Sequence, residues 1–502
     1  MNRLSQLIAF AFGGALAFAA LQSLSACSQG QLSIDQVVRA FGGSAIDATG
    51  QRELKRFYET FDAYTNDAND VRHRDHFRDA FRLVRANYVV KVDDAQLIDA
   101  ALKGMVDMEP PPRRGSVAPE LLVEAALDGM MASLDPHSSY LNPSEYKESN
   151  IITKGEFGGL GIEVTMEEGL IKVISPIEDT PAYRAGVQAG DLITHLDGVP
   201  IKGKTLTDAV KIMRGRPGTG IRLTISRADT APFDIAVVRA VIVVRSVRWH
   251  LEGNIGYVRV MSFTSQVEPK LEEAMADMFA AAAVANDGPL RGLVLDLRNN
   301  PGGLLDQSLF VSDAFLESGV IVSVRERNPR NERVYMAGPG DLSHGLPMVV
   351  LINGGSASAS EIVAGALKDQ GRAVIMGRRS FGKASVQIIQ PLPVEGALKL
   401  TTARYYAPSG HTIQARGVSP DIILNGPLPT EGDDAPKIRR EADLPGALGG
   451  DSLSEKAATA TLAREQCPKA GPEGEDMELG CALAYLRAGS AKAFMSAVAP
   501  AQ

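Results

Sequence analysis

The chain has 502 residues, and 52 Lys and Arg against 60 Asp and Glu give it a formal net charge of −8. That length predicts about two to four domains, and 45% hydrophobic residues supply a real core. The composition excludes a collagenous, coiled-coil or mainly disordered protein. The slight acidic excess disfavours nucleic acid as a partner, because phosphate binding needs a basic surface.

The N-terminus has the layout of a secretory signal peptide, predicted over residues 1–26. Arg3 precedes an apolar run over residues 7–21, and small residues follow. Residues 24–27, Leu-Ser-Ala-Cys, resemble a bacterial lipobox. This resemblance implies an exported, periplasmic protein anchored by a lipid on Cys27, and by analogy the serine that follows favours the outer membrane. A plain signal peptide or an uncleaved anchor helix stays open as the alternative.

Three cysteines are too few for a disulfide scaffold or a multi-thiolate zinc protein. If Cys27 carries the lipid, Cys467 and Cys481 remain as an even pair. Disulfides persist in an exported protein, but the sequence leaves open whether these two residues are bridged.

Residues 67–150 predict a helical N-terminal domain, after a linker of weak helical periodicity over residues 27–66. Two segments in it, 97–105 and 122–130, look alike, and a Pro-rich loop at 110–115 separates them. Apolar residues recur at three- and four-residue spacing at Phe77, Phe81, Val84 and Tyr88.

Short apolar runs between Gly and Asp turns predict a β-rich domain over residues 151–236, with one amphipathic helix at 206–213. Residues 158–163 read Gly-Gly-Leu-Gly-Ile-Glu, and glycines let successive N–H groups face a concavity suited to a carboxylate. With its later turns the segment looks like a PDZ domain. The resemblance implies binding of a protein C-terminus as an added strand. The residues beside the terminal carboxylate would be Gly159, Leu160, Gly161 and Ile162.

Strands and helices alternate over residues 237–425, which predicts an α/β core with a largely parallel sheet. Residues 426–502 are rich in Pro, Gly, Asp and Ala. We expect them to form a mobile tail with a last helix around residues 477–486.

A buried-strand pattern at residues 348–352 leads into a turn with three serines and then a helix. A serine at such a turn, Ser358, presents its hydroxyl above the sheet edge. The N–H of Ala359 then lies at the positive end of the helix, where an oxyanion would bind. The same serine also begins a capping box with Glu361, so a purely structural role stays open. Ser356 and Ser360 are rival caps.

Lys383 lies in an apolar stretch flanked by glycine. Desolvation lowers the pKa of a lysine, and a neutral amine can take a serine proton. Gln387 follows four residues later; that separation is about 13 Å in a strand but about 5–6 Å on a helix. We therefore predict a helical turn in which Gln387 orients the Lys383 amine. The alternative is an ordinary surface lysine.

A third segment has a buried strand at residues 293–297 followed by Pro-Gly-Gly at 301–303. Glycines let the backbone approach a substrate closely, and the Gly303 N–H is a candidate second oxyanion donor. A bare Pro-Gly-Gly is also a common turn.

These three segments, in this order, closely resemble those of the carboxyl-terminal processing (tail-specific) serine proteases. Segments 133–140 and 405–421 add to the resemblance. It implies a crotonase-like α/β core with an inserted PDZ domain and a helical N-terminal domain. In this family pattern Ser358 is the nucleophile, Lys383 the general base and Gln387 its orienter. Ala359 and Gly303 supply the oxyanion hole.

The resemblance implies an envelope serine endopeptidase that binds protein C-termini through its PDZ domain and needs no metal or organic cofactor. It also points to Arg214 as a residue that couples the bound tail to activation, with Arg216 an equal candidate. It leaves room for an adaptor protein and a homo-oligomer. The Pro-rich insertion at 109–119 and the long tail depart from the pattern and leave regulation open.

Two other functions compete with this interpretation. One is a Ser-His-Asp hydrolase with His411 or His344 as its base, and the other is a non-catalytic PDZ scaffold. A metallopeptidase is disfavoured because His-Glu-x-x-His is absent. We expect His73 and His76, on one helical face, to be solvated surface residues.

Overall fold

The computed structural model describes residues 46–177, 179–227, 230–243, 245–285, 287–425, 440–450, 458 and 460–498. The predicted signal peptide and Cys27 lie outside the described residues. Among the helices described, none is long and apolar enough to cross a membrane. Contacts divide the chain into one unit up to Tyr140 with Ile388–Thr401, and a second of Leu141–Gln387 with the residues from Thr402 onward.

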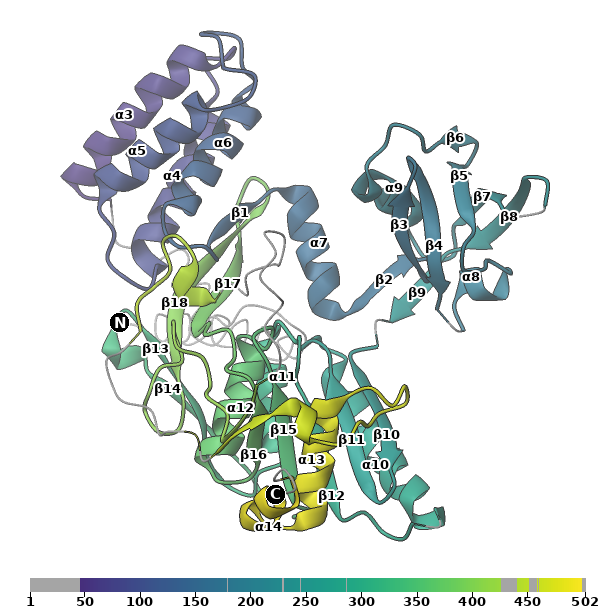
Figure 1. Ribbon diagram of the computed structural model, residues 1–502. Helices are drawn as coiled ribbons and strands as arrows, with labels where there is room; N and C mark the ends of the chain where they lie inside the picture. The colour runs from purple at the N-terminus through teal and green to yellow at the C-terminus, as the bar shows by residue number, and fades with distance from the viewer. Residues whose placement is uncertain are drawn as a thin grey trace, which may run out of the picture. The chain divides into compact units, whose positions relative to one another are not determined.

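The first unit is a helical bundle (Figure 1). Its apolar faces meet in the interior, where the Phe57 ring stacks on Phe77 with centroids 3.7 Å apart. The bundle therefore begins within the segment whose helical periodicity is weak. Its helices are α3 (Ala48–Tyr64), α4 (Val71–Asn87), α5 (Asp94–Val106) and α6 (Pro119–Ala132).

The two similar sequence segments form α5 and α6, which pack closely through a pair of glycines. A Cβ on Gly104 would lie 2.3 Å from the Ala125 carbonyl oxygen, and one on Gly129 would lie 2.5 Å from the Ala100 carbonyl oxygen. Because no side chain fits at either position, the two glycines allow the backbones of α5 and α6 to approach this closely.

In the second unit, α7 (Pro143–Lys154) leads into a middle domain, residues 156–243. A short ribbon of β2 (Glu156–Gly159) and β9 (Ala240–Val243) opens and closes this domain. Its main sheet has the order β3-β4-β5-β7-β8, with β6 on β5, so β3 is an edge strand. The remaining elements are β3 (Ile162–Glu167), β4 (Leu170–Pro176), α8 (Pro181–Arg184), β5 (Leu192–Leu196), β6 (Val199–Pro200), α9 (Leu206–Met213), β7 (Gly220–Ser226) and β8 (Phe233–Val238).

The core of the second unit is a seven-stranded sheet of order β10-β11-β12-β15-β16-β19-β20. The pairs from β11 to β20 are parallel and only β10 with β11 is antiparallel, which confirms the predicted parallel sheet. Its strands are β10 (Val247–Glu252), β11 (Ile255–Val260), β12 (Gly292–Asp296), β15 (Met348–Ile352), β16 (Val374–Gly377), β19 (Ile422–Asn425) and β20 (Ala460–Ala463).

Side chains of the central strands alternate between two hydrophobic cores. Leu293, Leu295 and Val350 face the core shared with α10 (Val267–Val284), α11 (Leu305–Asp313) and α12 (Ala359–Asp369). Their neighbours Val294, Val349 and Leu351 face the core shared with α13 (Met477–Ala488) and α14 (Ala491–Val498). Both faces are therefore covered, as a parallel sheet requires.

A second sheet pairs β13 (Gly319–Glu326) with both β14 (Arg333–Ala337) and β18 (Ala397–Tyr406). β17 (Ser385–Pro391) and β1 (Ser139–Leu141) also pair with β18. Short 3-10 turns complete the described elements: η1 (Pro329–Asn331), η2 (Glu441–Asp443) and η3 (Arg464–Gln466).

The prediction of a mobile tail before the last helix is wrong for residues 460–476. β20 joins the main sheet beside β19, and Cys467 is bonded to Cys481 of α13, with Cα atoms 5.0 Å apart. The structure thus contains the disulfide that the sequence left open, and the expected helix around residues 477–486 is present as α13, although α14 follows it. Residues 426–439, 451–457 and 459 of the tail lie outside the described residues.

The prediction of solvated histidines is wrong for His76. Its side chain is 1% exposed, and neither ring nitrogen has a hydrogen-bond partner within the described structure. The ring meets Tyr140 edge-on, whereas His73 Nδ1 lies 2.6 Å from Asp70 Oδ2. Burial, together with the nearby His73 and Arg72, lowers the pKa of His76 to about 4.

This burial predicts a pH-dependent stability. Between about pH 6.5 and 4 the unfolded chain binds a proton at His76 that the folded chain does not, so stability falls as pH falls through this window. We expect a loss on the order of 2 kcal/mol, measured by denaturant unfolding of the bundle followed by circular dichroism. His76→Phe should abolish this loss, and His195→Gln in the middle domain should keep it. An unchanged pH slope in His76→Phe would contradict the assignment.

Candidate active site

The predicted nucleophile lies at the turn between β15 and α12. Ser358 has φ 55° and ψ −114°, a conformation that non-glycine residues rarely adopt and that is typical of functional turns. The rival serines are fully buried, and their hydroxyls donate to carbonyls: Ser356 Oγ to Leu297 at 2.7 Å and Ser360 Oγ to Asn300 at 2.9 Å. Of the three side chains, only Ser358 is partly exposed.

Glu361 joins the turn that carries Ser358 to the loop that carries Lys383. The N–H groups of these two residues donate to the same oxygen, Glu361 Oε2, at 2.7 and 2.9 Å. Oε1 accepts from Ser380 Oγ at 2.5 Å and from the Gly382 N–H at 2.7 Å. Burial raises the pKa of Glu361 to about 7, although all four donors favour its ionised form.

A buried tyrosine makes a second bridge between the same residues. The Tyr405 hydroxyl lies 3.0 Å from the Ser358 carbonyl oxygen and 2.5 Å from that of Lys383. Burial, with the charges of Glu361 and Glu441, raises the pKa of Tyr405 well above its usual value, so the hydroxyl stays a donor. The structure thus brings together Ser358 and Lys383.

The predicted helical turn between Lys383 and Gln387 is wrong. Lys383 lies in the loop before β17, and Gln387 lies on β17, where its Nε2 donates to Ser385 Oγ at 2.9 Å. Two long-range interactions prevent a helix: β17 pairs with β18, and the Lys383 N–H is bound by Glu361.

The Pro-Gly-Gly loop approaches the nucleophile turn through Gly302. This residue has φ 100°, and a Cβ on it would lie 2.9 Å from Ser358 Cβ and 3.0 Å from the Ala359 nitrogen. A Cβ on Gly303 would instead lie 2.2 Å from the Phe263 carbonyl oxygen. Sequence reasoning missed the role of Gly302, for which the doubled glycine was the available signal.

Two backbone N–H groups near Gly302 and Ser358 can still donate a hydrogen bond. Ala359 is the first residue of α12, where the helix offers no acceptor to its N–H. Among the described residues, no hydrogen bond takes up the Gly303 N–H. The Asn300 carbonyl holds the two loops together by accepting from the Ala357 N–H at 3.0 Å.

The predicted peptide site in the middle domain lies where β3 begins. Gly161 has φ 77°, and a Cβ there would lie 2.2 Å from Thr180 Cβ, so only glycine fits. Leu160 is buried in the core of this domain and Ile162 packs against it. Because β3 is an edge strand, its outer side can accept a further strand.

The two candidate coupling arginines differ in their surroundings. Arg214 ends α9, forms an ion pair with Glu148 of α7, and stacks on Phe157 with its guanidinium carbon 4.5 Å from the ring centroid. Arg216 is exposed.

The structure also describes residues that the alternative chemistries would use. Neither His344 nor His411 is hydrogen-bonded to Ser358 there; the His344 ring packs 5.1 Å from that of Phe279. No group of three or more His, Cys, Asp or Glu that could hold a metal ion occurs among the described residues.

Comparisons with known proteins agree on one family. Residues 254–424 match peptidase family S41, and residues 172–227 match a PDZ domain. A carboxy-terminal-processing protease of Bartonella bacilliformis is 46% identical over 423 residues, which cover 84% of this chain and 90% of that protein. A probable CtpA-like serine protease of Staphylococcus epidermidis is 35% identical over 61% of each chain. Among solved structures, the photosystem II D1 C-terminal processing protease is 28% identical, with a TM-score of 0.44, over 71% of this chain and 94% of that one.

Glu361 accepts hydrogen bonds from both the Ser358 turn and the Lys383 loop. We therefore expect kcat to fall further as more of its acceptor atoms are removed. In Glu361→Gln one oxygen becomes an amide nitrogen, which cannot accept from the backbone N–H that faces it, so we expect kcat to fall about tenfold. Glu361→Ala removes every acceptor and should lower kcat about 100-fold or more. Steady-state kinetics on a fluorogenic peptide measure both.

Ser380→Ala is the matched control for this series. It removes one side-chain donor from Oε1 and leaves both bonds to Oε2, so its kcat should fall least. If Glu361→Ala kept the wild-type kcat, the carboxylate would have no positioning role.

Proposed function

The chain belongs to peptidase family S41, and from this premise we propose that Ser358 and Lys383 together hydrolyse peptide bonds. Family membership makes the protein a serine-type peptidase with a PDZ domain. One observation carries the residue assignment: the backbones of Ser358 and Lys383 are held by the same Glu361 oxygen and the same Tyr405 hydroxyl.

The proposed reaction follows the general acyl-enzyme route. A neutral Lys383 amine takes the Ser358 hydroxyl proton as Oγ attacks the scissile carbonyl carbon. The N–H groups of Ala359 and Gly303 hold the resulting oxyanion. Lys383 then passes the proton to the leaving amine as the C–N bond breaks. Water attacks the ester carbonyl carbon as Lys383 accepts a proton from it. Lys383 then returns this proton to Ser358 Oγ as the acyl C–O bond breaks, which releases the carboxylic acid product and the free serine.

The role of Gln387 is proposed in a revised form. In a strand alternate residues share a face, so Ser385 and Gln387 project to one side of β17, and Lys383 lies two residues before Ser385 in the preceding loop. The bond from Gln387 to Ser385 Oγ supports a polar chain along that side. Gln387 would thus orient the lysine from the strand instead of from a helical turn.

We propose that the substrates are proteins recognised by their C-termini. The edge position of β3 and the glycine-lined turn at Gly159–Ile162 support strand addition with the terminal carboxylate bound at the turn. The ion pair of Arg214 with Glu148 of α7 supports its assignment as the coupling residue, because α7 lies directly before the PDZ domain in the chain.

The N-terminal sequence supports export to the periplasm with a lipid anchor on Cys27, and the outer membrane is the favoured destination. The acidic balance of the chain supports a protein substrate over nucleic acid. An adaptor protein and a homo-oligomer are compatible with this assignment.

The proposed catalytic pair of Ser358 and Lys383 predicts which substitutions abolish activity. Ser358→Ala and Lys383→Ala should each lower kcat/KM about 10⁴-fold or more, whereas His411→Ala and His344→Ala should not. In the wild type kcat/KM should rise with pH as Lys383 loses its proton. Peptidase activity that survives in Lys383→Ala, or a flat profile across neutrality, would contradict the lysine mechanism.

The assignment of Arg214 as the coupling residue predicts that substitutions of Arg214 and Arg216 have different effects on cleavage. Arg214→Ala should lower cleavage of a substrate with a PDZ-binding C-terminus about tenfold, because the link between α9 and α7 is lost. Cleavage of a short peptide without such a C-terminus should change little. Arg216→Ala is the matched control and should behave as wild type. Equal losses in both variants, measured side by side, would argue against Arg214.

A further inference from the structure

The C-terminal segment that departs from the expected family pattern is built into the protease core. β20 extends the main sheet, and the disulfide ties the residue after η3 to α13. Leu479, Leu483 and Leu486 of α13 pack in the same core as Val294 and Val349. Without this segment, one face of the two central strands would be exposed to water.

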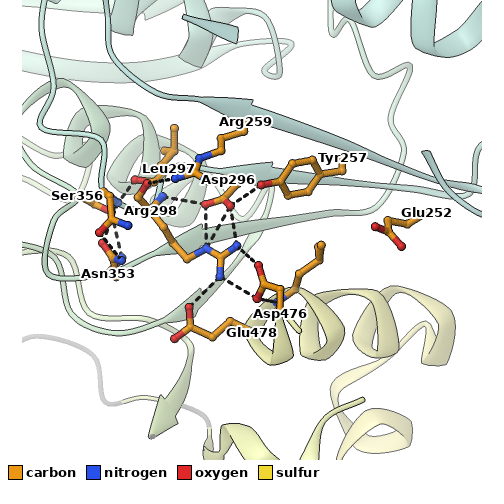
Figure 2. Close-up of polar contacts among 12 residues, drawn as sticks. Glu252, Tyr257, Arg259, Asp296, Leu297, Arg298, Asn353, Ser356, Asp476 and Glu478 are labelled. Carbon is orange, nitrogen blue, oxygen red and sulfur yellow. Dashed lines mark hydrogen bonds and ion pairs between the residues drawn. The ribbon is translucent and has the colours of Figure 1, made fainter. Parts of the chain in front are cut away.

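Two carboxylates at the N-terminal end of α13, those of Asp476 and Glu478, bind one arginine of the core, Arg298 (Figure 2). Arg298 donates to both carboxylate oxygens of Asp476, at 2.6 and 3.0 Å, and to Glu478 at 3.0 Å. From the other side it donates to both oxygens of Asp296, one at 2.7 Å, and the Tyr257 hydroxyl donates to the same carboxylate at 2.7 Å. Arg298 is therefore held between the sheet and the tail.

Arg298 directly precedes the loop that approaches the nucleophile. The next residue, Asn299, exchanges two hydrogen bonds with Asn353: its N–H donates to Asn353 Oδ1, and Asn353 Nδ2 donates to its Oδ1, both at 2.9 Å. The Asn353 N–H in turn donates to Ser356 Oγ at 3.0 Å. Hydrogen bonds to Arg298, the peptide bond from Arg298 to Asn299, and the hydrogen bonds of Asn353 thus connect Asp476 with the turn of Ser358.

The charges explain why these contacts are strong. The Arg298 side chain is 11% exposed and the Asp296 side chain is fully buried. Burial alone would raise the pKa of Asp476, but hydrogen bonds and charge from Arg298 outweigh it and keep this pKa below its usual value. Bidentate pairing of arginine with carboxylate also fixes geometry, because the planar fork matches both oxygens.

We propose that Asp476 and Arg298 are positioning residues that set the loop carrying Gly303, one of the two proposed oxyanion donors, so that the tail is part of the catalytic apparatus. The inference rests on the proposed function, because it takes Ser358 and that loop as the reacting site. None of the hydrogen bonds described above involves a residue of the PDZ domain or of strand β3. They should therefore affect the chemical step and not substrate binding.

The test compares two neighbouring carboxylates of the full-length protein. Asn caps a helix about as well as Asp, so Asp476→Asn keeps the cap to the Leu479 N–H but loses the charge and one acceptor toward Arg298. We expect kcat on a fluorogenic peptide to fall about tenfold with KM unchanged. Glu475→Gln is the matched control and should equal wild type, because Glu475 is exposed and forms its ion pair with Lys469 and not with Arg298 within the described residues.

Two further measurements separate the possible outcomes. Ser358→Ala tests the proposed function itself: if it remained active, the nucleophile assignment would fail whatever Asp476 does. If Ser358→Ala is inactive but Asp476→Asn keeps the wild-type kcat, the tail is only a structural cover and the inference is overturned. A melting temperature lowered together with an unchanged kcat leads to the same conclusion. A lower labelling rate of Asp476→Asn by a fluorophosphonate would support the inference without any peptide substrate.

Discussion

The active site depends on the hydrogen bonds of one buried carboxylate. An unpaired buried carboxylate would cost several kcal/mol, so Glu361, fully buried in the first turn of α12, requires donors. It obtains them from Ser358 and from residues 380–383, two segments that are distant in the chain. The carboxylate can be satisfied only when both segments are in place. The same interaction that stabilises the fold thus holds the backbones of Ser358 and Lys383, the proposed nucleophile and base.

A second constraint acts on the sheet that supports these loops. Parallel strands are apolar on both sides, and their alternate residues need cover on two faces. The helices α10, α11 and α12 cover one face, and the segment with α13 covers the other. This requirement explains why the tail is folded and disulfide-bonded. It also brings the acidic start of α13 next to Arg298 at the carboxyl end of β12.

The errors of the sequence predictions share one physical cause. The spacing of Lys383 and Gln387 is compatible with a helix, but pairing of β17 with β18 and the bond to Glu361 outweigh that local preference. Histidine is a polar residue and is expected at the surface, yet the bundle packs the ring of His76 against Tyr140. The Pro- and Gly-rich tail lacks strong periodicity, but a sheet edge accepts β20. Each outcome depends on a distant partner that local patterns do not reveal.

The sequence by itself determined the features that are carried by local patterns: the alternation of strands and helices in the core, the serine turn before α12, the glycine turn of the PDZ domain, and the pair Cys467 and Cys481. Only the tertiary structure decided which serine keeps an exposed hydroxyl, that Gly302 makes the close approach, and that Glu361 and Tyr405 link Ser358 to Lys383. Local patterns are visible in sequence because they arise from residues a few positions apart. The geometry of the site arises from hydrogen bonds between segments many residues apart, which exist only in the folded chain.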